Sequence, residues 1–174
     1  MAGLVPALNR LLEKMEQKEH KKRRLENYDY GSNGAYFITV CTYERAELFG
    51  SVGEPSEVAD KMKEIFEEVL STYSQISCPQ YVVMPNHLHA LLVIDKTGWE
   101  SREAIPDFMR VFKSKSTVAY IRMVEEGIAQ PFHGKLWQRS YYDHIIRNEQ
   151  DFREVWKYIE ENPLRWKLKR QKDL

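Results

Sequence analysis

The amino-acid sequence predicts an α+β domain of the ferredoxin-like, split βαβ type: an antiparallel sheet of four to five strands with helices, followed by a C-terminal helix. Two observations predict this class. Short runs rich in β-branched and aromatic residues alternate with longer amphipathic segments in the order strand, helix, strand, strand, helix, strand. A further amphipathic segment follows the last strand. The 174 residues suit one domain with a core of its own.

The first half of the domain contains three expected strands and one helix. Residues 36–43, with the sequence YFITVCTY, are typical of a strand. Ser56 is a suitable N-cap for a helix whose apolar residues recur at helical spacing as far as Tyr73. Residues 80–84 and 87–94 are strand-like and are separated by a Pro-Asn turn, so we expect them to form a hairpin.

The second half adds two helices and a strand. Residues 105–124 are predicted to form a helix that the polar sequence KSKST interrupts at 113–117. The aromatic-rich residues 136–146 are expected to form the fourth strand. Asn148 is the predicted N-cap of the last helix. Because a residue before proline is disfavoured in the α conformation, that helix is predicted to end at Asn162.

The charge of the chain is balanced overall, but both ends are basic. Residues 1–30 are expected to form a charged N-terminal arm, residues 31–164 the folded domain, and residues 165–174 a basic tail. An anionic partner such as nucleic acid would therefore be met mainly at the ends. Two cysteines, no secretory signal and no long apolar run lead us to expect a cytoplasmic protein without membrane contact.

A His-x-His pair on the hairpin is the first candidate site. His87 and His89 are two residues apart on a predicted strand, so both imidazoles point to one face while Leu88 and Ala90 point to the other. Two imidazoles on one face can bind one divalent ion. Taken alone, the pair fits a hydrogen-bonded, ligand-free core position better than a metal site, and both interpretations stay open at this point.

The last helix provides the group that could face the histidines. Its apolar residues recur at i, i+3, i+4 and i+7, which suits docking on a sheet: Phe152, Val155, Trp156 and Ile159. Tyr158 and Asn162 are four apart and lie on one flank of that stripe, roughly 40° from each other. An ordinary boundary tyrosine and a helix-end asparagine are the alternative interpretation.

A resemblance to a known family is carried by four segments: YDYGSNGAYFITVCTYERAELFG, YVVMPNHLHALLVI, FKSKST and LWQRSYYDHIIRNEQDFREVWKYIEENP. The chain resembles the single-tyrosine HUH transposases of the IS200/IS605 type, and most closely the REP-associated tyrosine transposases. Together these segments span most of the chain, so the resemblance is far more specific than the triplet HLH. It implies that residues 31–164 are a HUH transposase-like catalytic domain.

The resemblance also assigns the site. It implies that His87 and His89 bind Mg²⁺ or Mn²⁺, that Asn162 supplies a third ligand and that Tyr158 is the nucleophile. The implied reaction is cleavage and transfer of single-stranded DNA, next to a hairpin, through a 5′-phosphotyrosine intermediate. Relatives in mobile elements often carry glutamine at the position of Asn162, which favours the REP-associated branch. Because these ligands are neutral, we expect the ion to bind weakly alone and more tightly with DNA.

Six basic residues are candidates for binding the DNA backbone: Lys113, Lys115, Arg139, Arg147, Arg165 and Lys167. The expected partner is single-stranded or hairpin DNA, the expected state a monomer or homodimer, and the expected location the nucleoid. Two other functions are weighed against this one. A non-catalytic nucleic-acid-binding module would use exposed aromatics of an RRM-like sheet. A zinc site or metal hydrolase would need a carboxylate such as Asp95 beside the histidines.

Overall fold

The computed structural model describes residues 33–54, 56–95 and 104–172. Its elements follow in the order β1 (Gly34–Cys41), the 3₁₀ turn η1 (Tyr43–Arg45), α2 (Glu57–Ser71), β2 (Ile76–Met84), β3 (His87–Ile94), α3 (Ala104–Glu125), β4 (Tyr142–Ile146) and α4 (Glu149–Lys172). This order confirms the predicted α+β class with an added C-terminal helix. The predicted N-terminal arm, residues 1–30, lies outside the described residues.

The sheet has the order β2-β3-β1-β4, and each neighbouring pair of strands is antiparallel. This is the strand order of the split βαβ arrangement that the sequence predicts. The two central strands are β1 and β3, and their register places Thr39 opposite His89 and Cys41 opposite His87. The histidines therefore lie on an interior strand, paired on both sides.

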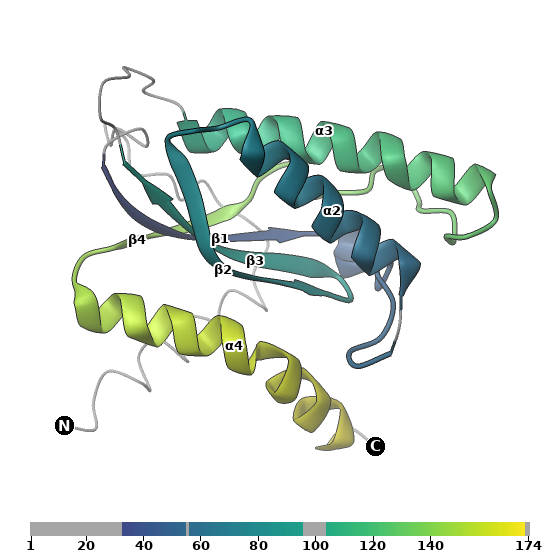
Figure 1. Cartoon of the computed structure of the whole chain (residues 1–174). Helices are drawn as coiled ribbons and strands as arrows, with labels where there is room; N and C mark the ends of the chain where they lie inside the picture. Colours follow the sequence, from purple (N-terminus) through teal and green to yellow (C-terminus); the bar gives the residue numbers. More distant parts are fainter. Residues whose placement is uncertain (1–32, 55, 96–103, 173–174) are drawn as a thin grey trace.

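Helices cover both faces of this sheet, with α2 and α3 on one side and α4 on the other (Figure 1). Even-numbered residues of β1 and β3, such as Ile38 and Ala90, pack beneath α2 and α3. Phe37 and Leu91 face α4. Because successive side chains on a strand alternate between faces, His87 and His89 point to the α4 side. In the described part of the chain, we find no helix with the length and apolar character needed to cross a membrane.

The predicted interruption of the second long helix is wrong, because α3 is continuous from Ala104 to Glu125. The hydroxyl of Ser116 donates to the carbonyl of Phe112 at 2.7 Å, and that of Thr117 to the carbonyl of Lys113 at 2.7 Å. Polar side chains of this kind can satisfy themselves on the preceding helical turn. The KSKST sequence is thus accommodated within the helix.

The fourth strand is shorter than the predicted residues 136–146 and begins at Tyr142. The preceding residues form a loop in which Trp137 makes an isolated bridge to Thr42. Trp137 is buried in the core beneath α2 and α3, and its indole donates to Ser116 Oγ at 2.9 Å. The aromatic composition of this segment therefore reflects burial of its side chains rather than strand pairing.

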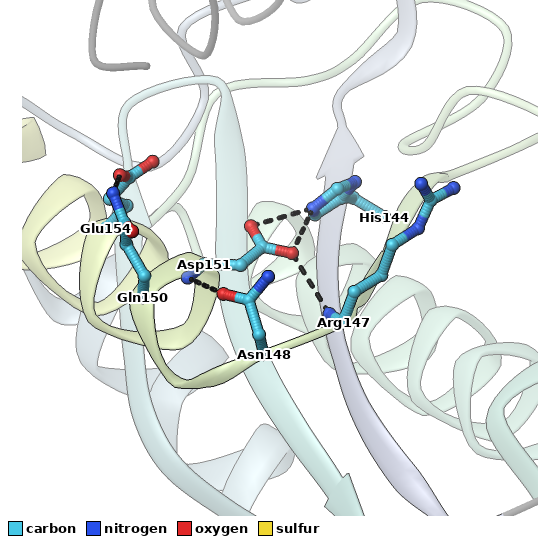
Figure 2. Close-up of polar contacts among 6 residues, drawn as sticks. All are labelled: His144, Arg147, Asn148, Gln150, Asp151 and Glu154. Carbon is cyan, nitrogen blue, oxygen red and sulfur yellow. Dashed lines mark hydrogen bonds and ion pairs between the residues drawn. The ribbon is translucent and has the colours of Figure 1, made fainter. Parts of the chain in front are cut away.

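The start of α4 is fixed to β4 by a polar cluster (Figure 2). Asn148 Oδ1 accepts from the backbone N–H of Asp151 at 2.9 Å, which confirms Asn148 as the N-cap. The Asp151 carboxylate lies 3.0 Å from Nε2 of His144 on β4 and accepts the backbone N–H of Arg147 at 3.1 Å. His144 thus links β4 to the first turn of the helix.

The predicted end of α4 at Asn162 is wrong, because the helix continues to Lys172 with Pro163 inside it. Proline has no N–H and disturbs the preceding helical turn, so an internal proline bends a helix without necessarily ending it. Figure 1 shows α4 changing direction along its length. The second half is attached to the loop after β1 by an ion pair between Arg170 and Glu47 at 2.7 Å. The basic residues after position 164 therefore lie on a helix as far as Lys172.

Candidate active site

Four side chains that the sequence predicts to share a site lie together between β3 and α4. The ring centroids of His87 and His89 are 4.5 Å apart, and the Tyr158 ring lies 5.2 Å from that of His89. The Asn162 side chain forms a hydrogen bond with His87. All four residues are buried, with 3% of His89 and 8% of Tyr158 exposed. The helix therefore brings its tyrosine and its amide onto the histidine face of the sheet.

Tyr158 and Asn162 lie in the centre of the docked seam rather than on its flank. The buried residues of α4 are Val155, Tyr158, Ile159 and Asn162. The predicted stripe members Phe152 and Trp156 are only partly buried at the edge. The Tyr158 ring packs edge-on against Phe37, at 5.8 Å between centroids and an interplanar angle of 88°. This aromatic contact gives the tyrosine a fixed place beside His89.

The protonation of His87 follows from its neighbour. The amide nitrogen of Asn86 donates to the carbonyl of Arg45 at 3.0 Å, so the amide oxygen is the atom facing His87. That oxygen lies 2.6 Å from Nδ1 of His87 and can only accept a hydrogen bond. Nδ1 therefore carries the proton and Nε2 keeps the lone pair, which is the form of the ring that can bind a metal.

His89 has a matching arrangement. Its Nδ1 lies 2.7 Å from the hydroxyl of Thr39, the residue opposite it in the register. Its Nε2 is buried and has no hydrogen-bond partner among the described residues. A buried polar atom without a partner carries a desolvation cost of about 1–3 kcal/mol, so native proteins rarely keep one without a reason. A metal ion bound at Nε2 would supply that reason.

Both imidazoles are neutral at physiological pH. Burial, and secondarily the charge of Arg45, lowers the pKa of His87 to about 3, while its hydrogen bond with Asn162 acts in the opposite direction. Burial, followed by His87 and Arg45, lowers the pKa of His89 well below its usual value. Metal ligation requires the neutral imidazole, so these environments favour the ligand form.

The donor set fits a divalent ion that accepts mixed nitrogen and oxygen ligands. His87, His89 and the Asn162 amide offer two nitrogens and an oxygen, which suits Mn²⁺ or Mg²⁺ completed by further oxygens. Within residues 33–54, 56–95 and 104–172, no group of three or more His, Cys, Asp or Glu side chains could hold a metal. Asp95 is exposed just beyond the end of β3. Within these ranges, the zinc or hydrolase alternative therefore lacks its carboxylate.

The RRM-like alternative is also disfavoured by the architecture. Such a module binds bases on an open sheet face lined with aromatics. Here α4 covers the face that carries Phe37 and the histidines, and α2 and α3 cover the other face (Figure 1). The described part of the sheet therefore offers no open aromatic platform.

The two lysines predicted to bind DNA lie on α3, across the sheet from the histidines. Lys113 Nζ donates to the carbonyls of Gln138 at 2.8 Å and Ser140 at 3.0 Å. Lys115 forms an exposed ion pair with Glu68 at 2.7 Å. The structure thus engages Lys113 with the loop before β4 and does not bring either lysine to the site.

Lys113→Met is expected to lower the free energy of unfolding by about 1–3 kcal/mol, because several carbonyls lose their donor. Lys115→Met is the matched control and should change it by less than about 1 kcal/mol, as exposed ion pairs contribute little. Urea denaturation of both variants measures the difference. Equal destabilisation would show that Lys113 does not hold the loop. Equal losses of affinity for single-stranded DNA at low salt would instead support the backbone contacts predicted for both lysines.

The other four predicted DNA contacts divide into two groups. Arg139 and Arg147 are exposed in the segments before and after β4. Arg165 and Lys167 lie on the second half of α4, close to the site. The Arg165 guanidinium lies 5.7 Å from the centre of the Tyr158 ring, and Lys167 Nζ lies beside Gly53. Of these four residues, Arg165 directly contacts a residue of the site.

Four neighbours of the site were not found from the sequence: Thr39, Arg45, Asn86 and Trp166. The Trp166 ring lies 5.7 Å from that of His87, and its Nε1 is the second buried atom without a hydrogen-bond partner among the described residues. Trp166 follows Asn162 by one helical turn, so its place would have been predictable had the helix been continued past Pro163. The contacts of the other three depend on tertiary structure.

Comparisons with known proteins identify the family of the chain. The model of the family described as "Transposase IS200 like" matches residues 32–162. The chain is 32% identical over 129 residues to the ISDra2 transposase TnpA of Deinococcus radiodurans, covering 72% of this chain and 81% of that protein. It is 21% identical over 150 residues to a putative REP-associated tyrosine transposase of Haemophilus influenzae, covering 81% of this chain and 77% of that protein.

A solved structure supports the fold independently. The structure of a REP-associated tyrosine transposase bound to a REP hairpin aligns with a TM-score of 0.56 at 19% identity, over 86% of this chain and 74% of that chain. The match confirms the α+β fold with its C-terminal helix. Since the family model covers most of the sequence and includes the histidine pair, Tyr158 and Asn162, the chain belongs to the IS200-like transposase family, whose members are enzymes of DNA transposition.

Proposed function

We propose that this transposase cleaves and rejoins single-stranded DNA with Tyr158 as the nucleophile and with a divalent ion held by His87, His89 and Asn162. The observation that carries the proposal is the unpartnered, buried Nε2 of His89, with the Tyr158 ring 5.2 Å from the same imidazole. A nitrogen that could bind a metal ion and a candidate nucleophile thus lie in the same small site.

The residues would act as follows. The Tyr158 oxygen attacks the phosphorus, the bond from phosphorus to the 3′-oxygen breaks, and the proton lost by tyrosine is balanced by the one that the 3′-hydroxyl gains. The 5′-phosphate remains on Tyr158. Attack by another 3′-hydroxyl reverses these steps, joins a new strand and releases the tyrosine. Neither water nor a nucleotide cofactor is consumed.

The ligands would be Nε2 of each histidine and the Asn162 amide oxygen. A bound Mg²⁺ or Mn²⁺ would neutralise charge on the phosphate and help to orient it. Asn86 and Thr39 fix the two rings through their Nδ1 atoms. The neutral ligand set leaves the charge of the ion to be balanced by the DNA, which supports tighter binding of the metal when DNA is present.

The substrate that we infer is single-stranded DNA beside a hairpin of repetitive palindromic sequence. The inference rests on similarity to proteins described as REP-associated tyrosine transposases, one of them solved with a REP hairpin. Arg165 lies beside the Tyr158 ring and Lys167 lies on the same half of α4, so both offer positive charge to a strand that reaches Tyr158. They are the candidates of first choice for backbone contacts.

A labelled-strand assay tests the proposal. Single-stranded oligonucleotides carrying a palindromic repeat that forms a hairpin are labelled at either the 5′ or the 3′ end and incubated with protein and Mn²⁺ or EDTA. On a denaturing gel, the 3′-labelled strand should migrate with the protein and the 5′-labelled strand should be shortened, in Mn²⁺ only. An adduct carrying the 5′ label would contradict the 5′-phosphotyrosine link. Binding without any adduct would favour a non-catalytic module.

Asn86→Ala is expected to lower Mn²⁺ affinity about 10- to 100-fold, because the residue orients a ligand without touching the ion. Asn148→Ala is a matched control: it removes an N-cap hydrogen bond and costs about 1 kcal/mol of stability, but it should leave Mn²⁺ affinity unchanged. Titration calorimetry and thermal unfolding separate the two effects. Unchanged metal affinity in Asn86→Ala would rule out this positioning role.

A further inference from the structure

Two buried side-chain nitrogens have no hydrogen-bond partner among the described residues: Nε2 of His89 and Nε1 of Trp166. Both rings lie beside the His87 ring, with centroid separations of 4.5 Å and 5.7 Å. A metal ion could satisfy the imidazole nitrogen, but an indole N–H can only donate a hydrogen bond. The proposed metal site therefore accounts for one of these nitrogens and leaves a buried donor, which costs free energy, without an acceptor.

The place of Trp166 follows from the course of α4. Tyr158 and Trp166 are separated by two steps of four residues, so they share one side of the helix. The Tyr158 ring lies 5.2 Å from that of His89, whereas the Trp166 ring lies beside His87. The helix thus runs from the His89 end of the pair to the His87 end, and it places the indole at the opposite end from the candidate nucleophile.

A second contact holds the indole in place. The Arg170 guanidinium lies 5.6 Å from the centre of the Trp166 ring, and Arg170 forms an ion pair with Glu47 at 2.7 Å. Glu47 belongs to the segment after η1, so two parts of the chain fix the ring. Because the ring already has these neighbours, base stacking, the common use of aromatic side chains on single strands, is not the role we expect. The N–H is the group left to bind.

The surroundings favour an anionic acceptor. The part of α4 that carries Trp166 is basic and ends with Lys169, Arg170 and Lys172. A phosphodiester offers charged oxygens, and hydrogen bonds to a charged acceptor are about twice as strong as those between neutral groups. In a buried site the low local dielectric strengthens such a bond further. DNA, the proposed substrate, supplies these oxygens along its backbone.

We propose that Trp166 is a further DNA-binding residue of the site, whose indole N–H donates to an oxygen of a phosphodiester lying at the His87 end of the histidine pair. This inference rests on the proposed function for its substrate, but it requires no cleavage. The indole keeps its proton and exchanges no atoms. Its contact fixes the strand on the side of the site away from Tyr158, and so helps to set which phosphate reaches the tyrosine.

The test uses two changes at position 166 that remove the donor. Trp166→Phe keeps an aromatic ring beside His87, and the tryptophan analogue benzothienylalanine keeps the size of the ring but has sulfur in place of the N–H. Trp156→Phe is the matched control, because Trp156 is a second half-buried tryptophan of α4 and packs against Phe152 instead. Each change is made in the full-length chain together with Tyr158→Phe, so that the strand is bound but not cleaved.

Three quantities are measured for each chain: the affinity for a hairpin-bearing single strand with Mn²⁺, the affinity for Mn²⁺ without DNA, and the temperature of unfolding. We expect both changes at position 166 to lower the DNA affinity about 10-fold, the loss that corresponds to one hydrogen bond to a charged acceptor. The DNA-free Mn²⁺ affinity should stay at the parental value, because the indole does not bind the ion. Trp156→Phe should match the parent in both affinities.

Neutral linkages in the DNA locate the acceptor. Methylphosphonate replaces each phosphodiester beside the hairpin in turn, which removes a charged oxygen from one known position of the strand. At the linkage that Trp166 contacts, methylphosphonate and Trp166→Phe should together cost little more affinity than either alone. At the other linkages the two losses should multiply.

Three results would overturn the inference. One is a parental DNA affinity in both chains changed at position 166. Another is an equal fall in DNA-free Mn²⁺ affinity, which would assign the indole to the ion or to the placement of His87. The third is a set of losses that multiply at every linkage, since the acceptor would then not be a phosphate oxygen.

Failure of the proposed strand transfer gives a different result. If the chain that keeps Tyr158 binds the strand in Mn²⁺ but forms no adduct, the transfer fails. The Trp166 inference is then still decided by the affinities, because they are measured in a chain that cannot react.

Discussion

Replacing Tyr158 with phenylalanine is expected to abolish the covalent protein–DNA adduct and to lower strand cleavage by at least about 10,000-fold, since removing a nucleophile leaves no equivalent route. The fold should tolerate the change. The phenylalanine ring can keep the edge-on contact with Phe37 at 5.8 Å and the place beside His89. We therefore expect thermal unfolding to stay within about 1 kcal/mol of the wild type. Single-turnover gels with a 3′-labelled strand measure the loss.

Tyr142→Phe is the matched control for this prediction. Tyr142 is a half-buried tyrosine on the α4 side, with its ring 6.4 Å from that of Phe37, but it lies on β4. We expect it to form the adduct at the wild-type rate. An adduct that survives in Tyr158→Phe and disappears in Tyr142→Phe would move the nucleophile from the helix to the strand.

His89→Leu is expected to lower Mn²⁺ affinity by at least about 100-fold, because the site loses one of its two imidazole ligands. Adduct formation, which depends on the ion, should be abolished as well. Stability should respond very differently. The substitution removes the buried, unpartnered Nε2 and puts an apolar side chain in a buried position, although Thr39 loses its partner. These effects oppose each other, so the free energy of unfolding should change by less than about 2 kcal/mol.

The dissociation of metal binding from stability is the informative part of that experiment. His133→Ala serves as the control, since His133 is exposed in the loop between α3 and β4. It should alter neither measurement. If His89→Leu keeps the Mn²⁺ affinity of the wild type, the buried Nε2 of His89 is not a metal ligand. If the variant unfolds at room temperature, His89 is a structural residue of the core.

Periodicity could predict which side chains of this site share a face, whereas their roles were implied by the family resemblance. The two-residue period of a strand places His87 and His89 on one face whatever the exact register. The helical period places Tyr158 and Asn162 on one side of α4. The order of elements fixes the sheet topology, because few connections are compatible with it. None of these steps required knowledge of a contact distant in sequence.

What could not be predicted depends on tertiary contacts. The helix continues past Pro163 to Lys172, and its second half contacts the rest of the molecule through Trp166 beside His87 and Arg170 beside Glu47. The aromatic residues around Trp137 are buried as a loop against α3. Asn86 bridges Arg45, in the turn after β1, and His87, at the start of β3. No local sequence pattern predicts this contact. Local propensity carries no information on such bridges.

The placement of the histidines on an interior strand has a consequence for local opening. Hydrogen exchange from β1 and β3, which are paired on both sides, requires more of the molecule to open than exchange from the edge strands β2 and β4. By contrast, α4 is held by a separate, smaller cluster of five buried residues, Phe37, Leu91, Val155, Tyr158 and Ile159. Amides of α4 should therefore exchange before those of β3. We therefore expect the tyrosine and the imidazoles to open with different free energies, so that local opening of the helix leaves the histidine pair assembled.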